Sequence, residues 1–305
     1  MVNTMKTKQQ KEALAYFKEH AQDWKREANI KSQDQVNVIK QRNDYVIKVI
    51  NERKSTELVL DIGCGTGDLV CEIAKKSINV IGVDFSEEMI NIAKDNAKKL
   101  QLGKANFKCC SIFDYSFEPN KYDLISANGL IEYISYEKFN KLLDVSLEAL
   151  KLGGSLVLGS RNRLFNIFSL NKFTEEEIDE RDIIALLLEA IQIVKSNDIK
   201  CLIGLKTALL QKADKKHQQT GVKVSTRYQF TPVQLINILK DKGFKPIEIF
   251  PIHIHGVLPK FKEKFPSVHG NISNLLQNYG EKNMCLIPQS SSFMIHVKKG
   301  EICQR

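Results

Sequence analysis

Three glycines and an acid at the end of an apolar run are the residues of this 305-residue chain whose types and spacing best suit ligand binding. The run LVLDI at 58–62 contains Asp61 and is followed by Gly63, Gly65 and Gly67. Glycine lets the backbone come close to a ligand and adopt positive φ angles. The spacing therefore predicts a strand, a turn that holds a group that is not protein, and then a helix.

A second acid narrows the class of ligand. Asp84 ends the apolar run INVIGVD about 20 residues after Gly63, where an acid at the tip of a second strand accepts hydrogen bonds from ribose hydroxyls. Asp68 occupies the place of the third glycine of a dinucleotide fingerprint, and its carboxylate would repel a diphosphate. The turn also lacks the lysine of a P-loop. We therefore expect a ligand that carries a ribose and a positive centre but no phosphate.

The elements that must position these residues alternate along the chain. Short apolar runs at 57–62, 78–84, 105–112, 122–127 and 155–160 are separated by helical patterns such as 86–100, in which Ser86 stands at the N-cap. Strands that alternate with helices predict a parallel sheet with right-handed crossovers. Two further strands are expected at 245–254 and 291–299.

We expect four regions along the chain. They are an N-terminal helical cap at 1–54, a ligand-binding core at 55–160, a helical lid insertion at 161–226, and at 227–305 the remainder of the core with an irregular insertion at 255–290.

Five segments in this order resemble class I S-adenosylmethionine-dependent methyltransferases. They are LVLDIGCGTG, VIGVDFSEEMI, CCSIFD, YDLISANGLIEYI and ALKLGGSLVLGS, and together they cover about a third of the chain. The resemblance implies an α/β fold with a Rossmann-like, doubly wound sheet of seven mostly parallel strands and an antiparallel last strand. It also implies S-adenosylmethionine as cofactor and S-adenosylhomocysteine as product.

The family pattern assigns cofactor contacts to specific positions. Asp84 would hold the ribose, Phe85 and Met89 would lie beside the adenine, and Asn128 would lie at the amino acid end of the cofactor. Ser111 stands where the family often has an acid, which leaves its role open. The full expected cofactor set is Asp61, Gly63, Cys64, Gly65, Gly67, Asp84, Phe85, Met89, Ser111, Ile112 and Asn128. Arg42 either reaches the carboxylate of the cofactor or is an ordinary surface arginine.

Three residues are candidates for catalysis. Many small-molecule O-methyltransferases of the family carry histidine where this chain has Tyr133. A tyrosine with a pKa near 10 is a poor base at neutral pH. Tyr133 therefore either orients the acceptor or packs on the pocket wall. Glu132 is the second choice there. His253 and His255 share one face of a strand and are expected as a base or as part of the substrate wall. Without a nearby cysteine or carboxylate, two histidines do not predict a metal site.

The acceptor is expected to be a small molecule, methylated on a hydroxyl oxygen of a metabolite or sugar. SANG at 126–129 replaces the N-P-P-[FY] signature of amine methylation. An RNA methyltransferase and a non-catalytic scaffold that binds the cofactor remain as alternatives. Arg161 and Arg163 either hold an anionic acceptor or pair with the acidic segment 175–182.

Composition limits the partners and the compartment. The net charge is +9, but the basic segment 212–219 lacks the aromatic residues that stack on bases, so contact with nucleic acid is not expected. Seven scattered cysteines without a C-x-x-C pair predict reduced thiols in a cytoplasmic protein. No run approaches the roughly 18 apolar residues that a membrane span needs. We expect a monomer or a homodimer.

Overall fold

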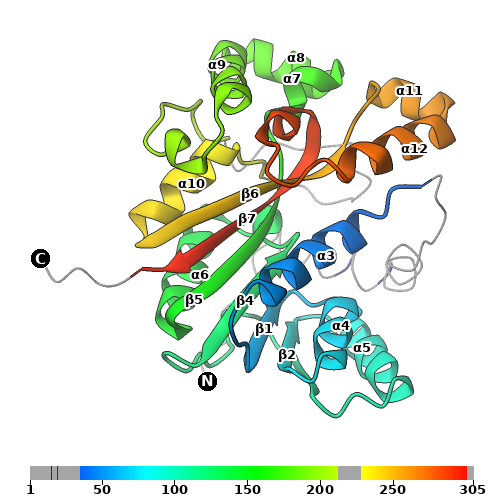
Figure 1. The fold of residues 1–305 in the computed structure, drawn as a ribbon, viewed down its shortest axis with the longest axis vertical. Coiled ribbons are helices and arrows are strands. Elements are labelled where there is room, and N and C mark those ends of the chain that lie inside the picture. The colour runs from blue at the N-terminus through cyan, green and yellow to red at the C-terminus, as the bar shows by residue number, and fades with distance from the viewer. Residues whose placement is uncertain (1–14, 16–18, 20–34, 212–227, 301–305) are drawn as a thin grey trace, which may run out of the picture.

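The computed structural model describes residues 15, 19, 35–211 and 228–300, and its centre is a seven-stranded sheet in the order β3-β2-β1-β4-β5-β7-β6 (Figure 1). The strands are β1 (Leu58–Ile62), β2 (Asn79–Asp84), β3 (Ala105–Cys109), β4 (Tyr122–Asn128), β5 (Leu150–Arg161), β6 (Phe244–Ile254) and β7 (Ser290–Lys299). Neighbouring strands from β3 to β5 pair in parallel, and β7 is antiparallel to both β5 and β6. The predicted fold class, with its antiparallel last strand, is confirmed.

Helices cover both faces of this sheet. The described α-helices are α3 (Val38–Asn51), α4 (Asp68–Lys75), α5 (Glu87–Lys99), α6 (Tyr136–Ala149), α7 (Phe165–Ser169), α8 (Lys172–Asp179), α9 (Ile183–Lys195), α10 (Pro232–Asp241), α11 (Pro259–Lys264) and α12 (Pro266–Gln277). Short 3-10 helices lie at η1 (Ile131–Tyr133), η2 (Ile199–Leu202) and η3 (Met284–Gln289).

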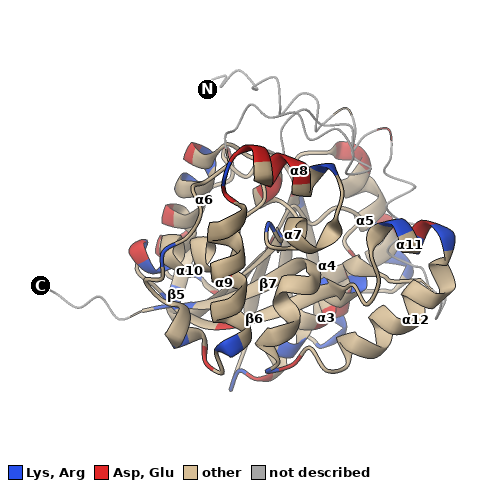
Figure 2. Cartoon of the chain, turned by 90° about the horizontal axis from the view of Figure 1, so that it is seen from above, with Lys and Arg blue, Asp and Glu red and all other residues tan. Residues whose placement is uncertain are grey.

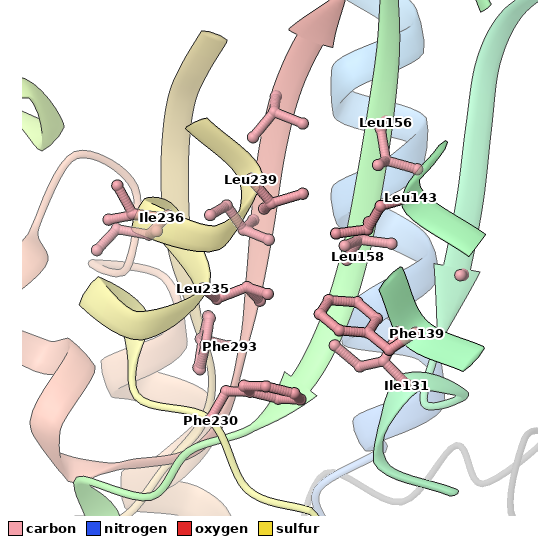
Figure 3. Packing of buried hydrophobic residues seen from close by; sticks show 14 of the residues in the cluster. Ile131, Phe139, Leu143, Leu156, Leu158, Phe230, Leu235, Ile236, Leu239 and Phe293 are labelled. Atoms are coloured by element: carbon pink, nitrogen blue, oxygen red, sulfur yellow. The ribbon is translucent and has the colours of Figure 1, made fainter. Parts of the chain in front are cut away.

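Alternate residues of each strand feed two separate cores. Val59, Leu124 and Val157 pack with α3 and α4 on one face. Their neighbours along the strands, such as Leu60, Ile125 and Leu158, pack with α6 and α10 on the other face (Figure 3). This alternation follows from the two-residue period of a strand, and it explains why the strands are apolar on both sides.

Helix starts follow the capping residues in the sequence. The Ser86 hydroxyl accepts the Met89 N–H at 3.3 Å and begins α5 one residue inside the predicted range. Thr231 and Gln234 form a capping box at the start of α10, with Pro232 in the first turn. These local signals fix where the chain leaves each strand and thereby hold the strand ends in place.

Two of the expected regions differ in detail from the structure. The insertion 255–290, expected to be irregular, contains α11, α12 and η3, because prolines stand in the first turn of α11 and of α12, where they favour a helix rather than break it. In the N-terminal region, α3 packs against the sheet, with the Tyr45 ring stacked on Phe250 at 4.8 Å, and so belongs to a core layer. Most of 1–34 and all of 212–227 lie outside the described residues.

Within the parts of the chain that the structure describes, no helix has both the length and the apolar character needed to cross a bilayer.

Candidate functional site

The predicted cofactor residues gather at one edge of the sheet. In the parallel register Asp61 lies opposite Ser126, and Asn128 lies opposite Gly159, so the carboxyl ends of β1, β4 and β5 are adjacent. The Cys110 N–H donates to the Asp84 carbonyl at 3.0 Å and places the end of β3 beside the end of β2. Carboxyl ends of parallel strands are the usual ligand edge of an open α/β sheet.

The glycine turn uses its glycines for different purposes. Gly63, Gly65 and Gly67 have φ angles of 71°, 51° and 76°, all in the left-handed region. A Cβ atom at Gly67 would lie 2.7 Å from the Ala93 side chain, so this glycine allows close packing of helix and turn. A Cβ atom at Gly65 would meet nothing within 4 Å, so Gly65 faces open space. The turn thus presents bare backbone on the side where a ligand would lie.

Cys64 contributes its backbone to this turn. Its side chain is buried, and its sulfur would lie 2.8 Å from a Cβ atom at Gly82, so the thiol packs onto β2. Burial, with the charges of Asp84 and Asp61 nearby, raises the pKa of the thiol well above its ordinary value. The thiol is therefore protonated and unreactive at neutral pH.

The Asp84 carboxylate is held rigidly beside the turn. Its two oxygens accept the Gly65 N–H at 3.0 Å and the Ser86 N–H at 2.9 Å. Asp84 is 8% exposed, and burial raises its pKa, while the backbone N–H groups of Ser86, Gly65 and Phe85 act in the opposite direction. Each oxygen keeps a further lone pair, which is the arrangement that a vicinal diol requires.

Asp61 adds a second buried acid behind the turn. It accepts the Ser126 hydroxyl at 2.6 Å. Burial raises its pKa to about 7, with the Ser126 hydrogen bond lowering it and the charge of Asp84 raising it further. A cationic ligand at this edge would favour the ionised form of both acids.

Asn128 provides the observation that tests whether a cofactor fits. Both polar atoms of its amide are buried and have no hydrogen-bond partner among the described residues. Buried polar groups without a partner are rare and point to a missing ligand or water. The Arg42 Nη1 atom would lie 2.6 Å from a Cβ atom at the adjacent Gly129, and its Nη2 atom donates to the Ser292 hydroxyl at 3.0 Å. An amide and a guanidinium therefore stand together where the amino acid end of the cofactor is expected.

The residues expected beside the adenine lie just after β2 and β3 and, for Met89, in the first turn of α5. Met89 and Ile112 are buried, whereas Phe85 and Ser111 are half-buried. The Ser111 hydroxyl accepts the Phe113 N–H at 3.3 Å, which uses part of its hydrogen-bonding capacity. Their assignment to the adenine stays a prediction.

The catalytic candidates fall into two groups. Tyr133 is buried at the end of η1, and the neighbouring Glu132 carboxylate accepts the Arg161 N–H at 3.2 Å, which ties η1 to the end of β5. His253 and His255 lie side by side at the end of β6, with ring centroids 4.2 Å apart. Burial lowers the pKa of His255 to about 3 and that of His253 well below its usual value. Both histidines are weak bases at neutral pH, and their predicted catalytic role stays a prediction.

Sequence reasoning missed His269 and left the role of Arg163 open. His269 of α12 joins His253, with 2.9 Å between their Nε2 atoms, and no short-range pattern connects the two. Arg163 is fully buried and pairs with Glu177 and Asp182, each at 2.6 Å, so it pairs with the acidic segment as one of the two alternatives stated.

Comparison with known proteins places the core of the chain in a family. Residues 59–154 match the family model described as a methyltransferase domain. The chain is 32% identical over 159 residues to the ubiquinone biosynthesis O-methyltransferase of Coxiella burnetii, a match that covers 52% of this chain and 65% of that protein. It is 29% identical over 148 residues to phosphoethanolamine N-methyltransferase 1 of Zea mays, covering 48% of this chain and 29% of that protein. The chain thus spans about two thirds or less of the length of these relatives.

A solved structure agrees over a longer stretch. Magnesium protoporphyrin IX methyltransferase from Synechocystis PCC 6803, determined with bound S-adenosylmethionine, superposes with a TM-score of 0.56 at 14% identity and covers 97% of this chain and 100% of that one. At this identity the likeness shows the fold alone. For the domain at 59–154, the family model and the sequence relatives confirm the resemblance to class I S-adenosylmethionine-dependent methyltransferases stated from the motifs.

Proposed function

We propose that the protein binds S-adenosylmethionine at the glycine turn and transfers its methyl group to a small-molecule acceptor, with a hydroxyl oxygen as the methylated atom. The observation that carries the proposal is the Asp84 carboxylate, fixed by the Gly65 and Ser86 N–H groups beside bare backbone. The Asn128 amide, which has no hydrogen-bond partner among the described residues, supports the proposal from the opposite side of the turn.

The residues present fit this cofactor chemically. Asp84 offers two oxygens to a ribose, and Asp61 and Asp84 together favour a ligand with positive charge. Asn128 and the nearby Arg42 would receive the ammonium and carboxylate groups of the cofactor. A diphosphate would meet Asp68, whose carboxylate accepts the Thr66 hydroxyl in the first turn of α4.

The chemistry makes modest demands on the protein. The cofactor supplies a methyl group on a sulfonium, and the departing group is a neutral thioether. The chain contributes by holding an acceptor in line and by excluding water, and positioning alone supplies a large part of such rate enhancements. Tyr133 lies at the end of η1, directly after β4, where its phenol would orient an acceptor rather than deprotonate it.

The choice of a small-molecule hydroxyl rests on the relatives and on the motif. The Coxiella burnetii relative is named an O-methyltransferase and the Zea mays relative an N-methyltransferase, and both names refer to small molecules. SANG at 126–129 stands where an amine-methylating signature would be, which disfavours exocyclic amino groups of bases and protein amides as acceptors.

An RNA substrate is the weaker alternative on the described surface. Basic and acidic residues are interspersed along the helices, with acidic residues gathered on α8 and both basic and acidic residues on α11 (Figure 2). A nucleic-acid site usually needs one basic face. The basic segment 212–219 falls in a part of the chain that the structure does not describe.

The test compares two buried aspartates, one at the carboxyl ends and one at the amino ends of the parallel strands. Asp84→Ala should weaken S-adenosylmethionine binding by about 1–3 kcal/mol, the usual worth of a hydrogen bond to a charged group. Asp123→Ala is the matched control, because Asp123 is 7% exposed and also accepts two backbone N–H groups, those of Glu57 and Leu58 at 2.9 Å, at the amino end of β1. Calorimetry on folded samples should show a loss for Asp84→Ala alone, and equal affinities for all three proteins would contradict the ribose assignment.

Transfer itself needs a separate assay. Incubation of the wild-type protein with methyl-labelled cofactor and a panel of phenols, sugars, carboxylates and amines should label at least one hydroxyl compound, detected by mass spectrometry. Label on amines only would refute oxygen as the acceptor, and binding without any transfer would favour the scaffold alternative.

A further inference from the structure

Three buried histidines meet at the carboxyl end of β6. His253 is the penultimate residue of β6, His255 follows the strand, and His269 comes from α12, which packs on β6. Their ring centroids are 4.2, 4.7 and 5.2 Å apart, and one ring nitrogen from each lies within 4.8 Å of the others. The three residues are only 8%, 9% and 2% exposed. The sequence predicted only that His253 and His255 lie together, and the fold brings His269 to them.

Hydrogen bonding within the protein leaves this cluster unsatisfied. Neither ring nitrogen of His255, nor Nδ1 of His269, has a hydrogen-bond partner among the described residues. Among the described residues, one hydrogen bond joins the rings, between the Nε2 atoms of His253 and His269 at 2.9 Å, and only one of those two nitrogens can donate. Buried polar atoms without a partner cost free energy, so the cluster is incomplete as it stands.

The surroundings keep the imidazoles neutral and oriented. The three rings are buried, and burial favours the neutral form of an imidazole. A neutral imidazole offers a lone pair, which is the form that coordinates a metal. The Ser291 hydroxyl lies 3.2 Å from Nδ1 of His253 and holds that ring with Nε2 directed toward His269.

The backbone at His253 is held in an unfavourable conformation. Its φ angle is 54°, in the left-handed region that residues other than glycine rarely adopt, and the Gln41 side chain accepts its N–H at 2.9 Å. Such strain tends to be retained at ligand sites. It sets the direction of the His253 ring within the cluster.

We propose that His253, His255 and His269 form a binding site for a divalent transition metal, with Zn²⁺ as the best fit. Three imidazole nitrogens without a carboxylate suit Zn²⁺ and its neighbours rather than Mg²⁺ or Ca²⁺, which prefer oxygen. Zinc bound by three protein ligands keeps a fourth position for water or for an oxygen or nitrogen of a bound molecule. The inference stands independently of the proposed methyl transfer.

Glu177, Glu180 and Asp182 form the second group of possible metal ligands among the described residues, but it does not compete as a cation site. The Arg163 guanidinium already lies among these carboxylates, 2.6 Å from Glu177 and Asp182 and 3.9 Å from Glu180, and so supplies the positive charge there.

The experiment uses the untagged full chain after removal of metal with a chelator. Titration with Co²⁺ should give the visible absorption of a tetrahedral complex and saturate at one metal per chain, and Zn²⁺ should displace it. The variants His255→Asn and His269→Gln should each lose affinity by at least about 100-fold, the upper end of the loss seen when only the partner of a ligand is removed.

His296→Gln is the matched control. His296 is also buried, at 4% exposure, and is hydrogen-bonded to the Ser155 hydroxyl at 2.9 Å in the middle of the sheet. It should bind Co²⁺ as the wild type does. Wild-type protein without a Co²⁺ complex, or cluster variants that bind as tightly as His296→Gln, would overturn the proposal.

A measurement on wild-type protein guards against variants that fail to fold. The X-ray absorption spectrum of the Zn²⁺ form should show three imidazole ligands, and fewer than three would overturn the proposal. S-adenosylmethionine affinity, measured on the same samples, should be unchanged in His269→Gln, which separates failure of the metal site from failure of the proposed function.

Discussion

Gly65 and Gly67 are two residues apart in one turn, yet the structure predicts opposite consequences of changing them to alanine. Both have left-handed backbones, with φ angles of 51° and 76°. Only Gly67 is crowded, since a Cβ atom there would lie 2.7 Å from the Cβ atom of Ala93 and 2.9 Å from the ring of Phe107. Gly65 has open space where its side chain would be. The pair therefore separates packing from ligand binding within one loop.

The expected magnitudes follow from these distances. Gly65→Ala places an alanine in the left-handed conformation, which should lower the free energy of unfolding by about 1–2 kcal/mol. Gly67→Ala adds the same strain and the overpacking of a rigid helix and ring, about 1–3 kcal/mol more. For cofactor binding the order reverses: the new methyl group of Gly65→Ala occupies the open side of the turn and should weaken S-adenosylmethionine binding at least tenfold, about 1.4 kcal/mol.

Chemical denaturation and calorimetry measure both quantities on the same samples. The free energy of unfolding should fall in the order wild type, Gly65→Ala, Gly67→Ala, and among folded samples the affinity for S-adenosylmethionine should fall most in Gly65→Ala. The reasoning is refuted if Gly65→Ala binds the cofactor as tightly as wild type, or if the two variants lose the same stability.

Two further predictions concern buried charges. Arg163→Met should destabilise the protein by about 3–5 kcal/mol, because Glu177 is left buried without the guanidinium that pairs with it. The double variant Arg163→Met with Glu177→Met should recover much of this loss. A double variant no more stable than Arg163→Met would contradict the assignment of a buried ion pair. Burial raises the pKa of Asp61 from 3.8 to about 7, so the folded state favours the protonated acid and loses stability relative to the unfolded chain as pH rises through that window. Asp61→Asn without cofactor should therefore gain stability relative to wild type between pH 4 and pH 7, as measured by denaturation at each pH, and a constant difference would disprove it.

The parts of the molecule that could be predicted from the sequence are those encoded by neighbouring residues. Gly63, Gly65 and Gly67, with Asp84 about 20 residues after Gly63, together predict a strand end, a turn and a ligand-binding edge. The structure places these residues at one edge of the sheet. The parallel pairing of the strands from β3 to β5 followed from their alternation with helices. The helix starts at Ser86 and Thr231 were likewise local signals.

The parts that were missed depend on contacts between distant segments. His269 joins His253 only because α12 folds back onto β6, and its own sequence surroundings carry no pattern of a ligand. The insertion 255–290 is irregular by prediction, whereas Pro259 and Pro266 within it each stand in the first turn of a helix. A proline can mark either an irregular segment or the first turn of a helix, and only packing decides between them.

The segment expected as a lid over the acceptor is anchored more firmly than a lid requires. Leu186 and Ile193 of α9 belong to the same buried cluster as Leu235 of α10 and the strands beneath it. The Glu189 carboxylate accepts the Val233 N–H at 3.0 Å, which joins α9 to the start of α10. Swinging α9 outward would expose this apolar surface to water and break that bond, at a cost set by the buried area. In the described part of 161–226, α9 therefore acts as a fixed wall of the core, and any movement that admits an acceptor must come from segments outside this cluster.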